Sequence, residues 1–442
     1  MTTRVIIVRH GQSTYNLEQR IQGRCDESTL TPKGQADAVT VGKALKSLNI
    51  AAFYCSPLQR ASQTARIICD RLDAEIEPQP LEKLREIDLP LWEKLTKTEV
   101  KSRFGAEYRQ WKSNPDQFKM TLPDGREHFP VISLFQQARQ FWQEILPRHQ
   151  NQTILVVAHN GINRCLISTS LGMGPERYQS IQQSNCGINI LNFSGQLDDL
   201  VQLESLNQTA HLGVSTPSLR PGHQGVRLLL VRHGETQWNK ESRFQGIKDI
   251  PLNENGRAQA RQARDFLTNV PIDFAISSSL SRPKETAEII LEGHSQVTLD
   301  TDYELREISH GLWEGMLESE IEANFPGMLA EWKAQPETVQ MPEGENLQEV
   351  WNRANKAWER IVQAHGRSLQ TGLVVAHDAI NKVILCRLLG LPPAAIWSVK
   401  QGNGAVTVID YPQGPDSLPV IQAFNITSHL GGVLDKTAAG AL

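Results

Sequence analysis

Residues 4–16 read Arg4-Val-Ile-Ile-Val-Arg-His-Gly-Gln-Ser-Thr-Tyr-Asn16, and the pattern returns as Arg227-Leu-Leu-Leu-Val-Arg-His-Gly-Glu-Thr-Gln-Trp-Asn239. Each stretch opens with a short apolar run and turns polar at Arg-His-Gly. An uninterrupted apolar run of this kind is typical of a strand that is buried on both faces of a parallel sheet. The two stretches therefore predict an α/β fold in which an arginine and a histidine follow a strand, and this arrangement occurs twice.

The rest of the chain repeats in the same order. The further matching segments are Leu30–Gly34 with Leu252–Gly256, Ser56–Arg60 with Ser278–Arg282, Leu84–Ile87 with Leu305–Ile308, and Val156–His159 with Val374–His377. His10 and His233 stand 223 positions apart, and His159 and His377 stand 218 positions apart. So small a drift over a whole domain indicates loop deletions within one template, which means a tandem duplication.

The repeat divides the 442 residues into two domains. We expect an N-terminal domain over 1–213, a linker over 214–225, a C-terminal domain over 226–435 and a tail over 436–442. The linker is placed by its serine, proline and glycine content, which is typical of segments between domains. Each copy is long enough to bury a core of its own.

Within a copy, segments of strand type alternate with segments of helical type. Strands are expected at Val5–Val8, Ala52–Cys55 and Thr153–Val157, and in the second copy at Leu228–Val231, Phe274–Ile276 and Gly372–Val375. A helix is expected over Pro32–Leu48, because apolar residues recur there at helical spacing behind a Thr-Pro start. The alternation predicts, for each half, a mostly parallel sheet flanked by helices.

The composition limits the classes of partner. Lysine and arginine total 45 against 49 aspartate and glutamate residues, a net charge of −4, whereas general nucleic-acid binders are usually basic. No window approaches the roughly 18 apolar residues of a membrane-spanning helix, and Met1 leads into the first strand without a leader-like segment. The six cysteines are scattered and form no C-x-x-C pair. We therefore expect a cytoplasmic protein with no nucleic-acid or membrane partner, and the oligomeric state is left open.

In open α/β sheets the ligand site lies beyond the carboxyl ends of the strands, and related residues of each copy fall there or nearby. They are Arg9, His10, Arg60, Glu86 and His159 in the first copy, and Arg232, His233, Arg282, Glu307 and His377 in the second. Guanidinium groups match phosphate oxygens, a histidine can accept a phosphoryl group, and a carboxylic acid can protonate a departing alkoxide. A single such residue is weak evidence, but the recurrence of the whole set favours phosphoryl chemistry.

Zinc is the main chemical rival for paired histidines. The chain lacks the H-E-x-x-H pattern and the clustered Cys/His spacing of zinc sites, and the neighbouring arginines would repel a cation. No Walker A motif follows a strand. We expect chemistry without a metal or another cofactor.

At these residues the sequence resembles the histidine phosphatase superfamily, which has the phosphoglycerate mutase-like fold. The hallmark Arg-His-Gly-Glu/Gln-Ser/Thr-x-x-Asn is present as Arg9–Asn16 and Arg232–Asn239. The resemblance implies that His10 and His233 become phosphorylated on a ring nitrogen, and that Glu86 and Glu307 act first as acid and then as base. It also implies a phosphate pocket made of Arg9, Asn16, Arg60 and His159 in the first copy and of Arg232, Asn239, Arg282 and His377 in the second.

The tandem arrangement is similar to two-domain phosphatases of plants and cyanobacteria related to 2-carboxy-D-arabinitol-1-phosphatase. We expect a metal-independent phosphomonoesterase that hydrolyses small phosphorylated metabolites, with sugar phosphates as the main class. One alternative is a cofactor-dependent phosphoglycerate mutase, although copies of about 210 residues are short for a mutase of this family. The other is an enzyme in which one copy is a non-catalytic domain that binds a phosphorylated ligand.

The copies differ near the expected pocket mouth. The first copy has Pro90 and Lys94 where the second has Gly311 and Gly315, which stiffens or recharges the loop but leaves the catalytic set intact. Beyond this loop, helical lids are expected over 97–146 and 318–361. The aromatic residues of the first lid, Phe104, Tyr108 and Trp111, are assigned to packing because they recur at helical spacing.

Overall fold

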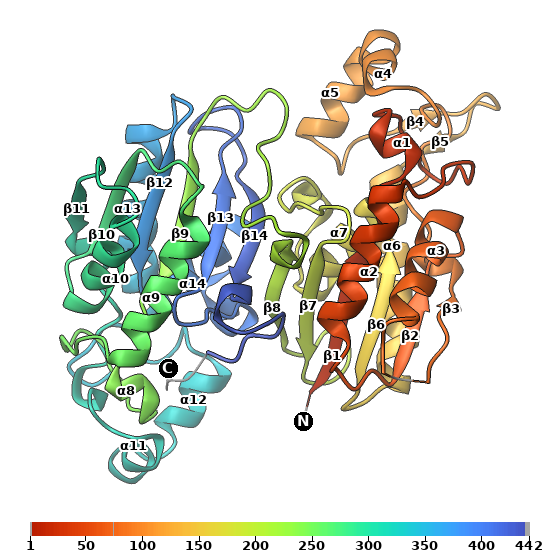
Figure 1. Cartoon of the computed structure of the whole chain (residues 1–442). Helices are drawn as coiled ribbons and strands as arrows, with labels where there is room; N and C mark the ends of the chain where they lie inside the picture. Colours follow the sequence, from red (N-terminus) through yellow and green to blue (C-terminus); the bar gives the residue numbers. More distant parts are fainter. Residues whose placement is uncertain (1, 74, 438–442) are drawn as a thin grey trace. The chain divides into compact units, whose positions relative to one another are not determined.

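The computed structural model describes residues 2–73 and 75–437, and the chain divides into two compact units, Met1–Val214 and Ser215–Leu442 (Figure 1). Of the tail predicted over 436–442, residues 438–442 lie outside the described part. Within the predicted linker, the carbonyl of Pro217 accepts a hydrogen bond of 2.7 Å from Arg227 Nη1. This part of the linker therefore packs on the second unit, and the domain boundaries themselves stay a prediction.

The first unit is built on a six-stranded sheet. In the order of hydrogen-bonded neighbours its strands are β8 (Val201–Gln208), β7 (Ile188–Phe193), β1 (Thr3–Arg9), β6 (Thr153–Ala158), β2 (Ala52–Cys55) and β3 (Gln79–Pro80). Strands β1, β6, β2 and β3 are parallel, whereas β7 pairs antiparallel with both β1 and β8. The predicted mostly parallel sheet is confirmed, and the antiparallel strands β7 and β8 are an addition that the sequence did not indicate.

The helices of the first unit lie between and beyond these strands. They are α1 (Thr14–Leu17), α2 (Pro32–Leu45), α3 (Gln59–Cys69), α4 (Lys97–Arg103), α5 (Gly105–Ser113), α6 (Pro130–Ile145) and α7 (Asn160–Ser170). Helix α2 begins as predicted, because Thr31 Oγ1 accepts the Gly34 N–H at 3.1 Å. It ends three residues before the predicted Leu48, since the Leu48 N–H bonds to the carbonyl of Leu45 in a tight turn at 3.0 Å.

The second unit repeats this architecture. Its sheet has the order β14 (Val420–Ile426), β13 (Val406–Asp410), β9 (Arg227–Arg232), β12 (Thr371–Ala376), β10 (Phe274–Ser278) and β11 (Leu299–Asp302). Its helices are α8 (Gln237–Lys240), α9 (Glu254–Leu267), α10 (Ser281–Leu291), α11 (Glu318–Asn324), α12 (Met328–Ala334), α13 (Leu347–His365) and α14 (Asp378–Leu389). Strand order and direction match the first unit pair by pair, as a tandem duplication requires.

Helices cover both faces of each sheet. In the first unit α2 packs with α3 and α6 with α7, and in the second α9 packs with α10 and α13 with α14. Figure 1 shows α2 and α9 in front of the strands of their own units. Residues Val5–Val8 and Leu228–Val231 are completely buried, which explains why these strands read as unbroken apolar runs.

The register of the parallel strands brings their carboxyl ends to one edge. Arg9 at the end of β1 pairs with Ala158 of β6, and Cys55 at the end of β2 pairs with Val157. The residues that follow these strands, which include His10 and His159, therefore start from neighbouring points. The second unit has the same alignment, with Arg232 opposite Ala376.

A contact between two glycines fixes the loop after β1. A Cβ atom on Gly11 would lie 2.4 Å from the carbonyl oxygen of Gly34, and the same atom on Gly234 would lie 2.3 Å from the oxygen of Gly256. No larger residue fits where the two backbones approach so closely. This contact explains why the segments ending in Gly34 and Gly256 recur together with the Arg-His-Gly stretches.

The segment predicted as a lid over 97–146 separates into two parts. Helices α4 and α5 and the two-stranded ribbon β4 (Met120–Thr121) and β5 (Glu127–His128) lie at the periphery of the unit (Figure 1). Helix α6 instead belongs to the core, because half of its residues are buried and Trp142 Nε1 donates to the Leu166 carbonyl at 3.0 Å. The aromatic residues of α4–α5 pack around Trp92, which confirms their assignment to packing.

No helix within residues 2–73 and 75–437 is long and apolar enough to cross a bilayer.

We expect the strand that carries Arg232 to depend on a buried ion pair. Arg227 contacts Asp410 through two hydrogen bonds of 2.7 and 2.9 Å, and both residues are buried. Arg227→Met leaves the carboxylate buried without its partner, and we expect a loss of about 3–5 kcal/mol in the free energy of unfolding of the second unit. The double variant Arg227→Met/Asp410→Leu should recover most of this loss. Calorimetric unfolding checks both values, and a double variant no more stable than the single one contradicts the expectation.

Candidate active sites

The histidine after the first strand is held as a neutral ring whose Nε2 carries a lone pair. His10 Nδ1 lies 2.7 Å from the carbonyl oxygen of Gly11, and His233 Nδ1 lies 2.7 Å from that of Gly234. A carbonyl only accepts, so Nδ1 carries the hydrogen and Nε2 keeps its lone pair. Burial, reinforced by the nearby arginines, lowers the pKa of both rings well below its usual value. Each ring is thus a neutral imidazole whose Nε2 can act as a nucleophile.

Two arginines lie close enough to this ring in each copy for their charges to lower its pKa. Arg60 donates to the carbonyls of Cys25 and Gly23, each at 2.9 Å, and its Nε has no partner in the described chain. In the second copy the Nε of the corresponding Arg282 donates to His233 Nε2 at 3.2 Å. Burial lowers the pKa of Arg282 to about 10, so it stays charged at neutral pH. A positive charge that could meet a phosphoryl group is therefore already in place beside the candidate nucleophile.

Arg9 and Arg232 are the second arginine of each pair. Arg9 Nη1 donates to the carbonyl of Gln183 at 2.8 Å, and Arg232 Nη1 donates to that of Gln401 at 2.6 Å. Burial lowers the pKa of Arg9 to about 10. These carbonyl contacts come from the loop before β7 or β13, so the antiparallel strands take part in holding the site.

The second histidine faces the first. The ring centroids of His10 and His159 are 5.1 Å apart, and those of His233 and His377 are 5.2 Å apart, in edge-on geometry. His159 Nε2 lies 2.7 Å from Ser56 Oγ, and its buried Nδ1 has no partner in the described chain. A ring fixed by a serine on one side therefore offers its other nitrogen to a ligand.

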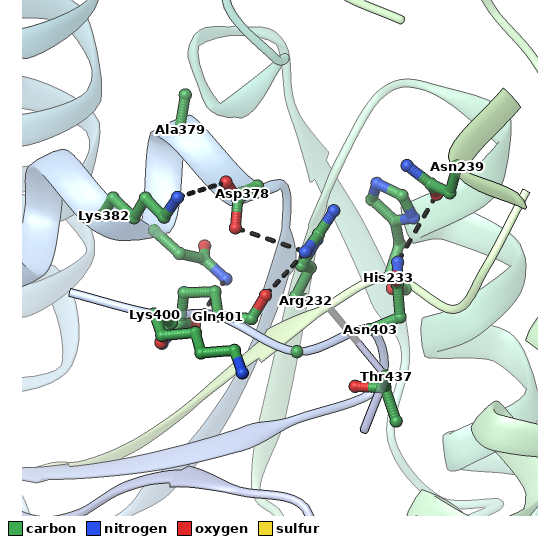
Figure 2. Close-up of polar contacts among 12 residues, drawn as sticks. Arg232, His233, Asn239, Asp378, Ala379, Lys382, Lys400, Gln401, Asn403 and Thr437 are labelled. Atoms are coloured by element: carbon green, nitrogen blue, oxygen red, sulfur yellow. Dashed lines mark hydrogen bonds and ion pairs between the residues drawn. The ribbon is translucent and has the colours of Figure 1, made fainter. Parts of the chain in front are cut away.

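The asparagine of the hallmark is oriented by its own loop. Asn16 Oδ1 accepts from the backbone and the hydroxyl of Ser13, each at 3.1 Å, and from Asn185 Nδ2 at 3.2 Å. Since the oxygen is occupied, the amide nitrogen is left to donate. In the second copy the amide nitrogen of Asn239 lies on the side of the His233 ring, as Figure 2 shows.

The carboxyl group is bound at the start of the helix that follows the second histidine, but the two copies hold it differently. Glu86 accepts from the backbone N–H groups of Gly161 at 3.0 Å and Ile162 at 3.1 Å. A Cβ on Gly161 would lie 2.5 Å from the Glu86 carboxylate. The second copy has Ala379 at this position, and there Glu307 keeps only one bond to the helix start, of 3.4 Å.

The second copy also has another carboxylate in the site. Asp378 Oδ1 lies 3.3 Å from Arg232 Nη1 and Asp378 Oδ2 lies 2.8 Å from Lys382 Nζ, so it bridges two cations (Figure 2). Burial, and next the charge of Asp378, raise the pKa of Glu307 above its usual value. A carboxyl with a raised pKa remains protonated to higher pH than an ordinary glutamate, which suits it as a proton donor.

The structure thus brings all twelve predicted site residues into two matching clusters. It also reveals contacts that were not assigned from the sequence: those of Ser56, Thr64, Arg164 and Asn185 in the first copy, with Ser278, Thr286, Lys382 and Asn403 in the second, and that of Asp378, which stands where the first copy has Asn160. Three of these pairs recur with identical residue types at the same offsets as the known motifs. That recurrence is a signal that could have found them.

Among residues 2–73 and 75–437, no three His, Cys, Asp or Glu side chains are grouped in a way that could hold a metal ion.

Comparison with known proteins agrees with this geometry. The model of the histidine phosphatase superfamily (branch 1) matches residues 5–206 and 228–426. The chain belongs to the histidine phosphatase superfamily. The 2-carboxy-D-arabinitol-1-phosphatase of Triticum aestivum is 35% identical over 442 aligned residues, which cover 97% of this chain and 86% of that protein. The probable 2-carboxy-D-arabinitol-1-phosphatase of Arabidopsis thaliana is 33% identical, covering 97% of this chain and 88% of that protein.

A third relative corresponds to a single copy. Phosphoserine phosphatase 1 of Hydrogenobacter thermophilus is 35% identical over 206 residues, which make up 47% of this chain and 95% of that protein. Together these matches confirm the tandem phosphoglycerate mutase-like fold, and they confirm that this member of the histidine phosphatase superfamily is a phosphatase.

The raised pKa of Glu307 predicts a pH dependence of the second site. Protonation of the leaving group needs the neutral carboxyl, so kcat falls as pH rises through this pKa. Asp378→Asn removes a negative neighbour and frees Arg232 and Lys382, and all three effects favour the carboxylate. We expect the alkaline limb of kcat to move to lower pH in His10→Ala/Asp378→Asn relative to His10→Ala.

The first copy provides the matched control, because Asn160→Asp in a His233→Ala chain places a carboxylate at the corresponding position. There the alkaline limb should move to higher pH. Limbs that stay in place in both variants would show that residue 160 or 378 does not act on the acid.

Proposed function

We propose that each copy hydrolyses phosphomonoesters of small metabolites, with sugar phosphates as the substrate class, through a phosphohistidine at His10 or His233 and without a metal ion. The observation that carries the proposal is the Nε2 lone pair of each of these rings. It lies in a buried site close to two arginines and to the glutamate that recurs in both copies, Glu86 or Glu307.

In the first step, Nε2 attacks phosphorus while the bond between phosphorus and the ester oxygen breaks. Arg9, Arg60 and His159, or their counterparts in the second copy, stabilise the charge on the phosphoryl oxygens, and the asparagine amide adds a donor. The departing alkoxide takes its proton from Glu86 or Glu307.

In the second step, the same glutamate, now a carboxylate, takes a proton from water as the water oxygen attacks phosphorus. The bond between nitrogen and phosphorus breaks, phosphate leaves, and the histidine returns to its neutral form. Because Nδ1–H stays bonded to the glycine carbonyl throughout, the ring needs no change of tautomer between the steps.

The choice of substrate class is supported by the relatives that span nearly the whole chain, which are named for a phosphorylated sugar acid. A phosphoglycerate mutase would use the same phosphohistidine but return the phosphoryl group to the product. The release of inorganic phosphate from an ester separates the two functions.

We expect brief incubation with a labelled phosphomonoester to transfer the phosphoryl group to both His10 and His233. The label should be labile in acid and stable in base, as expected for phosphohistidine. His10→Ala should leave label only in the second unit, and His233→Ala only in the first. Glu86→Gln or Glu307→Gln should slow phosphate release by its own copy about 10²–10⁴-fold, because only proton transfer is removed.

Peptide mapping of the labelled chain supplies the measurement, and Arg227→Met serves as a control for loss of stability without loss of a site residue. Label on a serine or aspartate, or full turnover by the His10→Ala/His233→Ala chain, would contradict the proposed mechanism.

A further inference from the structure

The two sites differ at three positions at the start of the helix after the second histidine, and two of these differences, Asn160 against Asp378 and Arg164 against Lys382, change a polar or charged group. The first copy reads His159-Asn160-Gly-Ile-Asn-Arg164, and the second reads His377-Asp378-Ala-Ile-Asn-Lys382. Positions 160 and 164, and likewise 378 and 382, are four residues apart on a helix, so their side chains lie on the same face. The pair is therefore one local unit, which carries an amide and a guanidinium in one copy and a carboxylate and an ammonium in the other.

In the second copy the charges of this unit are paired within the protein. Asp378 is almost fully buried and lies between Arg232, at 3.3 Å, and Lys382, at 2.8 Å (Figure 2). Lys382 Nζ also lies 5.2 Å from the centroid of the Trp397 ring. Both cations have a partner provided by the protein itself.

In the first copy the corresponding carboxylate is missing. Asn160 Oδ1 is buried without a partner in the described chain. Arg164 is only 6% exposed, and its one hydrogen bond within the described residues is from Nη1 to Gln179 Oε1, at 3.1 Å. Its Nε is buried without a partner. The site therefore holds the buried guanidinium groups of Arg60 and Arg164 and the half-buried one of Arg9, near the carboxylate of Glu86.

Arg164 is held in place from the side of the peripheral helices. Gln179 accepts from Arg164 Nη1 and donates through Nε2 to the carbonyl of Trp111 in α5, at 3.2 Å. The second copy builds the same connection from Trp397, whose Nε1 donates to the carbonyl of Trp332 in α12 at 3.3 Å. The cation is thus a fixed part of the site in both copies, and only its partner differs.

We propose that the first copy binds a carboxylate of its substrate between Arg9 and Arg164, at the place where the second copy carries its own carboxylate, Asp378. The first copy is then selective for phosphomonoesters that bear a carboxylate near the phosphate. The second copy is selective for esters without one. This inference rests on the proposed phosphatase function. It adds to that function an assignment of carboxylate-bearing esters to the first copy and of esters without a carboxylate to the second.

The groups between which the ligand would bind, Arg9 and Arg164, favour a carboxylate over another ligand. Buried guanidinium groups without a counter-ion are costly, and a planar carboxylate can accept two parallel hydrogen bonds from one of them. The amide of Asn160 can add a donor. In the second copy the same ligand would meet the negative charge of Asp378 in a buried setting, where like charges repel strongly.

The test compares D-3-phosphoglycerate with glycerol 3-phosphate, two esters that differ by a carboxylate in place of a hydroxymethyl group. Phosphate release is measured with His233→Ala, where only the first site turns over, and with His10→Ala, where only the second does. In His233→Ala we expect kcat/KM for phosphoglycerate to exceed that for glycerol phosphate by about tenfold or more, because a charged hydrogen-bonded pair can supply that difference. In His10→Ala the ratio of these two kcat/KM values should be one or below.

Exchanging the carboxylate should exchange the selectivity. Asn160→Asp in His233→Ala should bring the ratio back to about one, and Asp378→Asn in His10→Ala should raise it. Asn151→Asp adds the same charge at an exposed position before β6, at the opposite end of that strand from Asn160, and should leave the ratio of the first copy unchanged. If Asn151→Asp lowers the ratio as much as Asn160→Asp does, the inference is overturned, because the change in net charge alone would then explain the result.

Calorimetric binding of both esters to the chain that carries His10→Ala and His233→Ala repeats the comparison without turnover. Preferential binding of phosphoglycerate that is lost in Asn160→Asp supports the inference even if the first copy releases no phosphate, in which case the proposed activity of that copy fails by itself. Equal affinity for the two esters overturns the inference whatever the turnover.

Discussion

The hydrogen bond from Nδ1 of the first histidine to the carbonyl of the following glycine is the interaction on which each site depends. It fixes the tautomer, and so decides that Nε2 is the nitrogen that carries the lone pair. The glycine can present its carbonyl there because its backbone lies directly against that of Gly34 or Gly256, with no room for a side chain. The position of the loop after β1 is therefore set by the start of α2, and that of the loop after β9 by the start of α9.

The pairing of buried charges is the second constraint, and in this respect the two copies differ. Buried cations need either a partner from the protein or one from the ligand. The second copy provides Asp378, which pairs with Arg232 and Lys382 and also raises the pKa of Glu307. The first copy has Asn160 at this position and leaves Arg164 without a carboxylate. One change of residue type therefore alters both the surroundings of the candidate acid and the charge of the site, while the candidate nucleophile and the two arginines near it stay the same.

Much of this could be predicted because the chain contains its own comparison. Two copies of one template show which positions recur, and the strands around Val5–Val8 and the candidate nucleophiles follow from that recurrence. The strands β7 and β8 were missed because their sequences mix polar with apolar residues although nearly all of their side chains are buried. Helix α6 was placed in a lid because helical spacing reveals an apolar face but not what that face packs against.

By itself, the sequence determined the fold class, the duplication and the candidate reacting groups, because strand periodicity and repeated motifs are local properties of the chain. Only the tertiary structure decided which nitrogen of each first histidine carries the lone pair, which serine holds the second histidine, and which cations are paired with a carboxylate of the protein. These depend on atoms far apart in the sequence that meet at the end of a sheet. His159 and Ser56 are 103 positions apart yet 2.7 Å from each other, and no local pattern encodes that contact.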